Sequence, residues 1–230
     1  IGINSPALLC QAANKLGVPC VELLHAEGYV RPFSYDLSKR KGNSLPNGIL
    51  AFDIISLETF RHTLRGEVDV CLVPNPFLRR AIGNSALSFP EEWSAVPRKS
   101  SFAKRSVLFT MSHGSGNLEN LPDGSTELSQ ALGIPDKIIK LIESNLSIFW
   151  MLRLHPVQLR AQRFTDVRKT LSDFSSRCRN VEWQASSIMS IPQLASVADV
   201  HLTVASMAAY DLSVFGLKTV FLAKEFQRRY

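Results

Sequence analysis

Two basic side chains follow an apolar run in the stretch WMLRLHPVQLR, residues 150–160. The apolar run predicts a buried strand, and Pro156 predicts that a helix begins directly after it. Arg153 and His155 therefore fall where a strand passes into a helix, and both could contact an anionic ligand there. A core histidine with a backbone partner is the competing interpretation of His155.

A second set of candidates lies in the stretch TVASMAAYD, residues 203–211. Small residues precede a predicted helix, whose first N–H groups and dipole favour a phosphate. Thr203 and Ser206 stand at this turn. Asp211 follows about one helical turn after Met207, where a carboxylate can accept hydrogen bonds from a ribose diol. A solvent-facing aspartate is the alternative.

Two further turns carry histidines at the ends of predicted strands. His113 and Gly114 lie in the turn SHGSG, whose backbone N–H groups could cradle phosphates. The turn lacks the GxGxxG order and the lysine of a Walker loop, so a tight loop is its simpler explanation. His25 and Glu27 follow the first predicted strand in the turn HAEG.

Metal ligation has a weak signal in this chain. Asp199 and His201 are two residues apart on one predicted strand face, but no third ligand accompanies them. The sequence also has no DxD motif. We therefore expect no catalytic metal and no cofactor.

The candidate residues are separated by alternating strand and helix patterns. Strands are predicted at 18–24, 48–52, 68–73, 106–111, 148–154, 181–185, 200–204 and 219–222. Helices are predicted at 5–17, 56–65, 135–145, 157–177, 192–197 and 207–215. Apolar strands separated by helices indicate an α/β fold with a parallel sheet covered on both faces, and its ligands should lie beyond the carboxyl ends of the strands.

Composition limits the class of protein. The chain has 230 residues, 45% of them apolar, with no run of roughly 18 apolar residues that could span a membrane. Its four cysteines stand far apart without a CxxC pair, so the spacing predicts neither a disulfide framework nor a zinc site. The sequence therefore indicates a soluble protein of a reducing cytoplasm.

The net charge of +6 is concentrated in basic clusters. Such clusters favour nucleotide phosphates, an acidic membrane surface or nucleic acid, while a solvated helix face is the plainer explanation. No nucleic-acid-binding motif accompanies them, so we expect no nucleic-acid partner.

Taken in order, these segments resemble bacterial surface-polysaccharide glycosyltransferases of the capsule and O-antigen type, which have the GT-B architecture. The resemblance rests on KLGVPCVELLHAEGYV, SVLFTMSHGSG, FWMLRLHPVQLR, NVEW and PQLASVADVHLTVASMAAYDLSVFGLKTVFL. It covers residues 1 to about 223. No single motif is specific, but the ordered series is.

The resemblance implies two Rossmann-like domains facing each other across a cleft. We expect a partial N-terminal, acceptor-side domain at 1–82, a linker at 83–105 and a nucleotide-sugar-binding domain at 106–230. The first strands of the N-terminal domain and a closing C-terminal helix are not in this sequence, so we expect it to be a fragment of a larger enzyme.

The resemblance also assigns roles to the candidate residues. His155 and Pro156 match the HP motif that contacts the nucleotide, and Ser206 matches the serine before the last helix. Asp211 stands where relatives usually have glutamate. His25 or Glu27 is the candidate general base that deprotonates an acceptor hydroxyl.

The function implied is transfer of a sugar from a nucleotide-sugar co-substrate, without metal, to a growing surface polysaccharide or glycolipid. The expected location is the cytoplasm, with peripheral contact at the acidic inner face of the cell membrane. A nucleotide-sugar 2-epimerase, a polyol-phosphate transferase and a non-catalytic binding module remain as alternatives. An epimerase should carry several carboxylates along its cleft, and few stand at the predicted strand ends.

Overall fold

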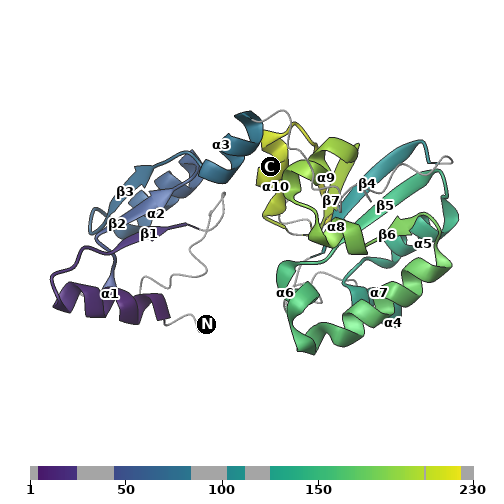
Figure 1. The fold of residues 1–230 in the computed structure, drawn as a ribbon, viewed down its shortest axis with the longest axis horizontal. Helices are drawn as coiled ribbons and strands as arrows, with labels where there is room; N and C mark the ends of the chain where they lie inside the picture. The colour runs from purple at the N-terminus through teal and green to yellow at the C-terminus, as the bar shows by residue number, and fades with distance from the viewer. Residues whose placement is uncertain (1–4, 25–43, 84–102, 112–124, 205, 224–230) are drawn as a thin grey trace. The chain divides into compact units, whose positions relative to one another are not determined.

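The computed structural model describes residues 5–24, 44–83, 103–111, 125–204 and 206–223. The chain divides into two compact units, Ile1–Gly83 and Asn84–Tyr230, and each is described by itself (Figure 1). Most of the segment expected as a linker, 83–105, lies outside the described residues.

The first unit is a small parallel sheet with helices. Its elements are α1 (Ser5–Lys15), β1 (Val21–Leu23), β2 (Gly48–Ala51), α2 (Ile54–Leu64), β3 (Asp69–Leu72) and α3 (Pro76–Gly83). The three strands are parallel in the order β1-β2-β3. Asp53 begins α2 because its carboxylate accepts the Ser56 N–H at 2.9 Å. The buried face of α2, including Phe60, packs with Ile49 and Val70 of the sheet.

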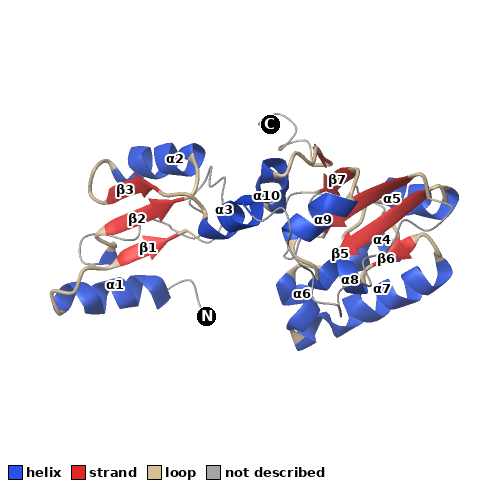
Figure 2. Cartoon of the chain, turned by 45° about the horizontal axis from the view of Figure 1, so that its top comes forward, coloured by secondary structure: helices blue, strands red, loops and turns tan. Residues whose placement is uncertain are grey.

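The second unit is a larger parallel sheet with helices on both faces (Figure 2). Its strands are β4 (Arg105–Thr110), β5 (Ile148–Arg153), β6 (Val181–Glu182), β7 (Val200–Thr203) and β8 (Thr219–Phe221). Its helices are α4 (Glu127–Leu132), α5 (Asp136–Ser144), α6 (Pro156–Arg160), α7 (Thr165–Arg177), α8 (Gln184–Ile188), α9 (Ile191–Val197) and α10 (Ala208–Val214). The expected α/β fold with parallel, Rossmann-like sheets is confirmed.

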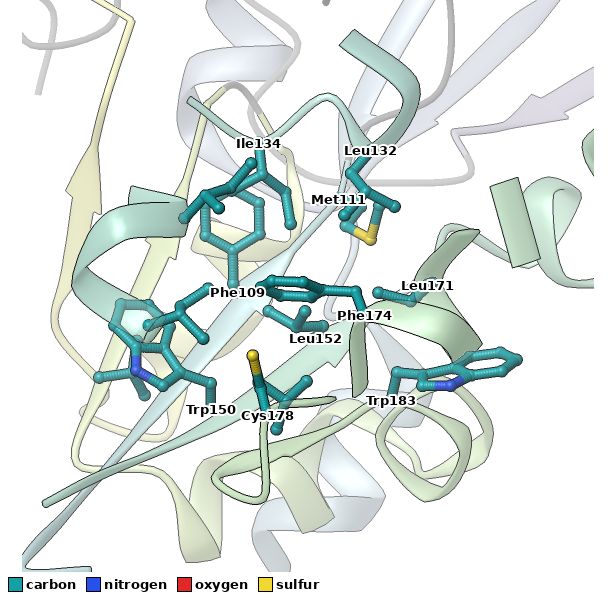
Figure 3. Close-up of a cluster of buried hydrophobic side chains, with 14 of the residues drawn as sticks. Phe109, Met111, Leu132, Ile134, Trp150, Leu152, Leu171, Phe174, Cys178 and Trp183 are labelled. Carbon is teal, nitrogen blue, oxygen red and sulfur yellow. The ribbon is translucent and has the colours of Figure 1, made fainter. Parts of the chain in front are cut away.

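Alternating side chains of β4 and β5 supply a core to each face of this sheet. On one face Phe109, Trp150 and Leu152 pack against α4, α5 and α7; Figure 3 shows them with Leu171 and Phe174 of α7. On the other face the side chains of β4 and β5 pack against α9 and α10 through residues Leu108, Phe149, Met151, Leu194 and Leu212. Both faces are covered, as expected for a parallel sheet.

Two of the predicted elements are partly wrong. The single helix predicted at 157–177 is wrong: Ala161 is extended (φ −75°, ψ 134°) and a 3-10 turn at Gln162–Phe164 separates α6 from α7. The Arg168 guanidinium stabilises this break by donating to the carbonyls of Gln158 (2.7 Å) and Ala161 (3.0 Å).

The strand predicted at 181–185 is also wrong beyond its first two residues. β6 ends at Glu182, whose carboxylate accepts the N–H groups of Ala185 (2.6 Å) and Ser186 (3.0 Å) and so begins α8. Helices α3, α4 and α8 were not predicted.

Candidate functional site

The order of strands in the larger sheet places a switch point beside β4. The order is β6-β5-β4-β7-β8, all parallel. The chain therefore runs outward from β4 through β5 and β6, then returns to the other side of β4 for β7 and β8. In open parallel sheets the crevice beyond the carboxyl ends at such a reversal is the ligand site.

Side-chain hydrogen bonds connect the strands on both sides of this switch point. Thr110, the last residue of β4, bonds to Nε2 of His201 through its hydroxyl at 2.8 Å. The other ring nitrogen of His201, Nδ1, bonds to the Thr219 hydroxyl at 2.8 Å. Thr203 donates its hydroxyl to the Thr110 carbonyl at 3.1 Å. Burial lowers the pKa of His201 to about 4, so the ring is neutral at pH 7.

Arg153, at the carboxyl end of β5, is half-buried and bound to backbone oxygens. Its Nη1 donates to the carbonyls of Ser186 and Met189, both at 2.6 Å, near the end of α8. Burial lowers its pKa, yet a guanidinium stays charged at neutral pH. These two bonds fix its position, while Nε and Nη2 donate to no residue that the structure describes.

His155 is half-buried and begins α6. Its Nδ1 accepts the Val157 N–H at 3.2 Å, and its own N–H donates to Oε1 of Gln158 at 3.0 Å. Because Nδ1 is an acceptor, the proton of the neutral ring is on Nε2. Pro156 is exposed at the first helical position, where its missing N–H costs nothing.

Ser206 and Asp211 lie beyond the carboxyl end of β7. The Ser206 hydroxyl accepts the Ala208 N–H at 3.2 Å at the start of α10. Asp211, in the first turn of α10, is half-buried, and burial raises the pKa of its carboxyl. It forms no hydrogen bond or ion pair with any part of the chain within the described ranges.

The structure thus brings part of the predicted set to one edge of one sheet. Arg153 and His155 follow β5, and Ser206 and Asp211 follow β7, the two strands that flank β4. Thr203 is fully buried and joins strands rather than facing an open surface. The other predicted residues, His25, Glu27, His113 and Gly114, lie outside the described residues.

Three further residues stabilise this part of the sheet, and of these the sequence singled out only His201, as a weak metal-ligand candidate. Thr110 and His201 bond across the switch point, and Glu182 holds the start of α8, whose end in turn binds Arg153. The signal for Glu182 was the spacing E-W-Q-A-S, in which an acid stands just before a possible first turn.

Within the described ranges, no group of three or more histidine, cysteine, aspartate or glutamate side chains is placed to hold a metal. A hollow of about 360 Å³ lies along the edge strand β8, lined by residues that include Tyr210, Lys218 and Phe221. Arg153, His155, Ser206 and Asp211 are not among the residues that line it. None of the described helices has the length and apolar character needed to cross a membrane.

No protein-family model and no curated protein matches the chain. Solved structures do match. UDP-GlcNAc 2-epimerase from Neisseria meningitidis, bound to UDP-GlcNAc, is 17% identical with a TM-score of 0.60, over 94% of this chain and 56% of that one. S. aureus MnaA, solved with UDP, is 13% identical with a TM-score of 0.59, over 92% and 53%. Anabaena HepE, solved with UDP and glucose, is 14% identical with a TM-score of 0.52, over 100% and 60%.

At these identities the likeness establishes the fold. It is a fold used by proteins that bind UDP or UDP-sugars, and the match includes both units of this chain. The chain spans between 53% and 60% of the length of these three neighbours.

Proposed function

We propose that this protein acts on a UDP-sugar and binds the UDP at the carboxyl edge of the larger sheet, beside the β4–β7 switch point. The fold likeness carries the proposal, since all three neighbours were solved with UDP or a UDP-sugar. The half-buried carboxylate of Asp211 supports the position, because a charged acceptor in that setting can bind a ribose diol.

Arg153 supports the same position by its charge. A nucleotide leaves as an anion in transfer reactions, and a fixed cation stabilises that developing charge without reorganisation. The two carbonyls that bind Nη1 hold the guanidinium at the strand end. Nε and Nη2, which donate to none of the described residues, can donate to a phosphate.

Nucleotide binding to the whole chain is the first test. UDP, and not CMP, CDP or GDP, should raise the midpoint of thermal unfolding, because a ligand of the native state stabilises it by mass action. Asp211→Asn should weaken UDP binding by about 1.5–3 kcal/mol, the scale of a hydrogen bond to a charged group. Calorimetric titration measures this difference.

Asp173→Asn is the matched control, since Asp173 is an exposed acid on α7 of the same unit. It should bind UDP as the wild type does. If no nucleotide stabilises the chain, the proposal is wrong. If Asp211→Asn binds UDP normally, nucleotide binding stands but Asp211 does not contact it.

Glycosyl transfer is the first candidate reaction, to a glycan or glycolipid acceptor. At the carboxyl edge, the Glu182 carboxylate accepts backbone N–H groups at the start of α8. Among the described residues of that edge, this leaves the Asp211 carboxylate to contact a substrate. An epimerase would need more carboxylates. The general base is proposed to be His25 or Glu27: His25→Ala or Glu27→Gln should then abolish turnover while UDP still binds.

Epimerisation at C2 is the second candidate, because the Neisseria meningitidis 2-epimerase is among the most similar structures. Proton NMR of UDP-GlcNAc with the protein and no acceptor separates the two. A new set of N-acetylmannosamine signals without acceptor identifies an epimerase. Release of UDP that requires an added sugar acceptor identifies a transferase.

Contact with an acidic membrane surface at the cytoplasmic face belongs to the same proposal. Arg163, in the 3-10 turn before α7, and Lys169 and Arg177 of α7 are exposed and could approach anionic lipid. Sedimentation with vesicles tests it: binding should require phosphatidylserine and decrease at high salt. Equal binding to neutral vesicles would contradict it.

A further inference from the structure

Two cysteines that are ten positions apart in the sequence meet in the first unit. The Sγ atoms of Cys10, on α1, and Cys20, just before β1, are 3.3 Å apart. Both are thiols. The turn after α1 reverses the chain and brings the two cysteines together: Gly17 has φ 68°, and the Val18 N–H donates to the Ala13 carbonyl at 2.9 Å. The sequence did not predict this contact.

The segment that leads into β2 holds both sides of this contact. Asn14, one turn after Cys10, donates its side-chain amide to the Leu45 carbonyl at 3.0 Å. The Cys20 N–H donates to Oδ1 of Asn47, and the Asn47 N–H donates to the Cys20 carbonyl, both at 2.7 Å. The two thiols are therefore held together by hydrogen bonds in which neither sulfur takes part, and which do not depend on a covalent bond between them.

Solvent reaches the two thiols unequally. Cys10 is 3% exposed, and Cys20 is half-buried. An oxidant can therefore approach Cys20, while the buried Cys10 sulfur lies close enough to react with the Cys20 sulfur. This arrangement of an accessible thiol beside a second thiol is the one found where oxidation ends in a disulfide.

The other two cysteines have different surroundings. Cys71 is exposed on β3. Cys178 is buried, and burial together with the nearby Glu143 raises the pKa of its thiol, which disfavours the reactive thiolate.

We propose that Cys10 and Cys20 are an oxidation site that closes to a reversible disulfide between α1 and the start of β1. With hydrogen peroxide as oxidant, the Cys20 thiolate takes one oxygen to become a sulfenic acid, and the rest of the peroxide leaves as water. The Cys10 sulfur then attacks the Cys20 sulfur, the S–O bond breaks, and a second water leaves. Two thiols lose two electrons and two protons, and one peroxide is reduced.

Peptide mapping of the full chain tests the proposal directly, because Lys15 lies between the two cysteines. Trypsin cuts after Lys15, so the peptide that ends there carries Cys10 and the next carries Cys20. Native protein treated with hydrogen peroxide, then iodoacetamide, should give these two peptides linked and two hydrogens lighter than their sum. Dithiothreitol should separate them.

The variant Cys71→Ser/Cys178→Ser should give the same linked pair, and adding Cys20→Ser should abolish it. The linked pair should also form faster in native protein than in guanidinium chloride, since the folded contact brings the thiols together. Separately alkylated Cys10 and Cys20 after oxidation would overturn the proposal. So would a link from Cys10 to Cys71 or Cys178, or closure that is no faster in the folded chain.

Discussion

His201 lies within the larger sheet with both ring nitrogens bonded to threonine hydroxyls. Burial lowers its pKa from 6.5 to about 4. The unfolded chain therefore takes up a proton below pH 6.5 that the folded protein does not accept until about pH 4. The contribution of the neutral His201 ring to the free energy of unfolding is therefore complete above pH 6.5. It is lost as the pH falls toward 4, by up to about 3 kcal/mol.

His201→Gln should remove this part of the pH dependence, because an amide can bond to hydroxyls but does not titrate in this range. Urea unfolding of both proteins at pH 7 and pH 4.5, followed by tryptophan fluorescence, measures the difference. An equal loss of stability in the two proteins on acidification would show that His201 is not the titrating group.

His155 stabilises the start of α6, and this role can be measured separately from any role in nucleotide binding. Its Nδ1 accepts the Val157 N–H at the start of α6. His155→Ala should lower the free energy of unfolding by about 1 kcal/mol, the usual cost of losing this kind of acceptor. His155→Asn keeps a side-chain acceptor and should retain most of that stability.

Nucleotide titration of the same two variants completes this prediction. If the imidazole binds UDP, both variants should lose affinity although only the alanine variant is destabilised. Normal UDP affinity in both would leave His155 with the structural part alone.

At the scale of elements, Asn180 fixes the end of α5 to the sheet. It is fully buried, and its Nδ2 donates to the carbonyls of Ile142 (3.0 Å), Asn145 (3.1 Å) and Ile148 (3.1 Å). Asn180→Ala leaves these carbonyls without that donor, at a cost of about 1–3 kcal/mol.

Asn180→Asp should be the more destabilised variant, because it places a carboxylate oxygen against carbonyl oxygens in a buried site. Chemical denaturation at pH 7 ranks the two variants. An aspartate variant as stable as the alanine variant would mean that the site admits water.

The elements also show why the sequence predicted the sheet better than the site. Apolar runs such as the one ending at Leu152 are local, so β4, β5 and β7 were found within one or two residues. The break at Ala161 depends on Arg168, seven residues later, whose side chain folds back onto it. The partner of Arg153 depends on α8, which forms because Glu182 turns back to begin it. The bonds of Arg153 to α8 are tertiary and leave no periodic pattern in the sequence.

At the scale of the whole chain, the two units differ in how completely their sheets are buried. β4 is buried from Ser106 to Thr110, and β5 from Phe149 to Leu152. In the first unit, Val21 and Leu23 of β1 are 58% and 55% exposed, and β3 buries only Val70. Less buried apolar area gives a smaller free energy of local opening.

Hydrogen exchange of the full chain should therefore rank the strands. We expect the amides of β4 and β5 to exchange slowest. Those of β2, the central strand of the first unit, should exchange faster, because the sheet that contains β2 is less buried. UDP should slow exchange in the larger sheet, because a ligand of the folded state lowers the population of open forms. Amides of β2 that outlast those of β4 would show that the first unit gains stability from contacts beyond its own described core.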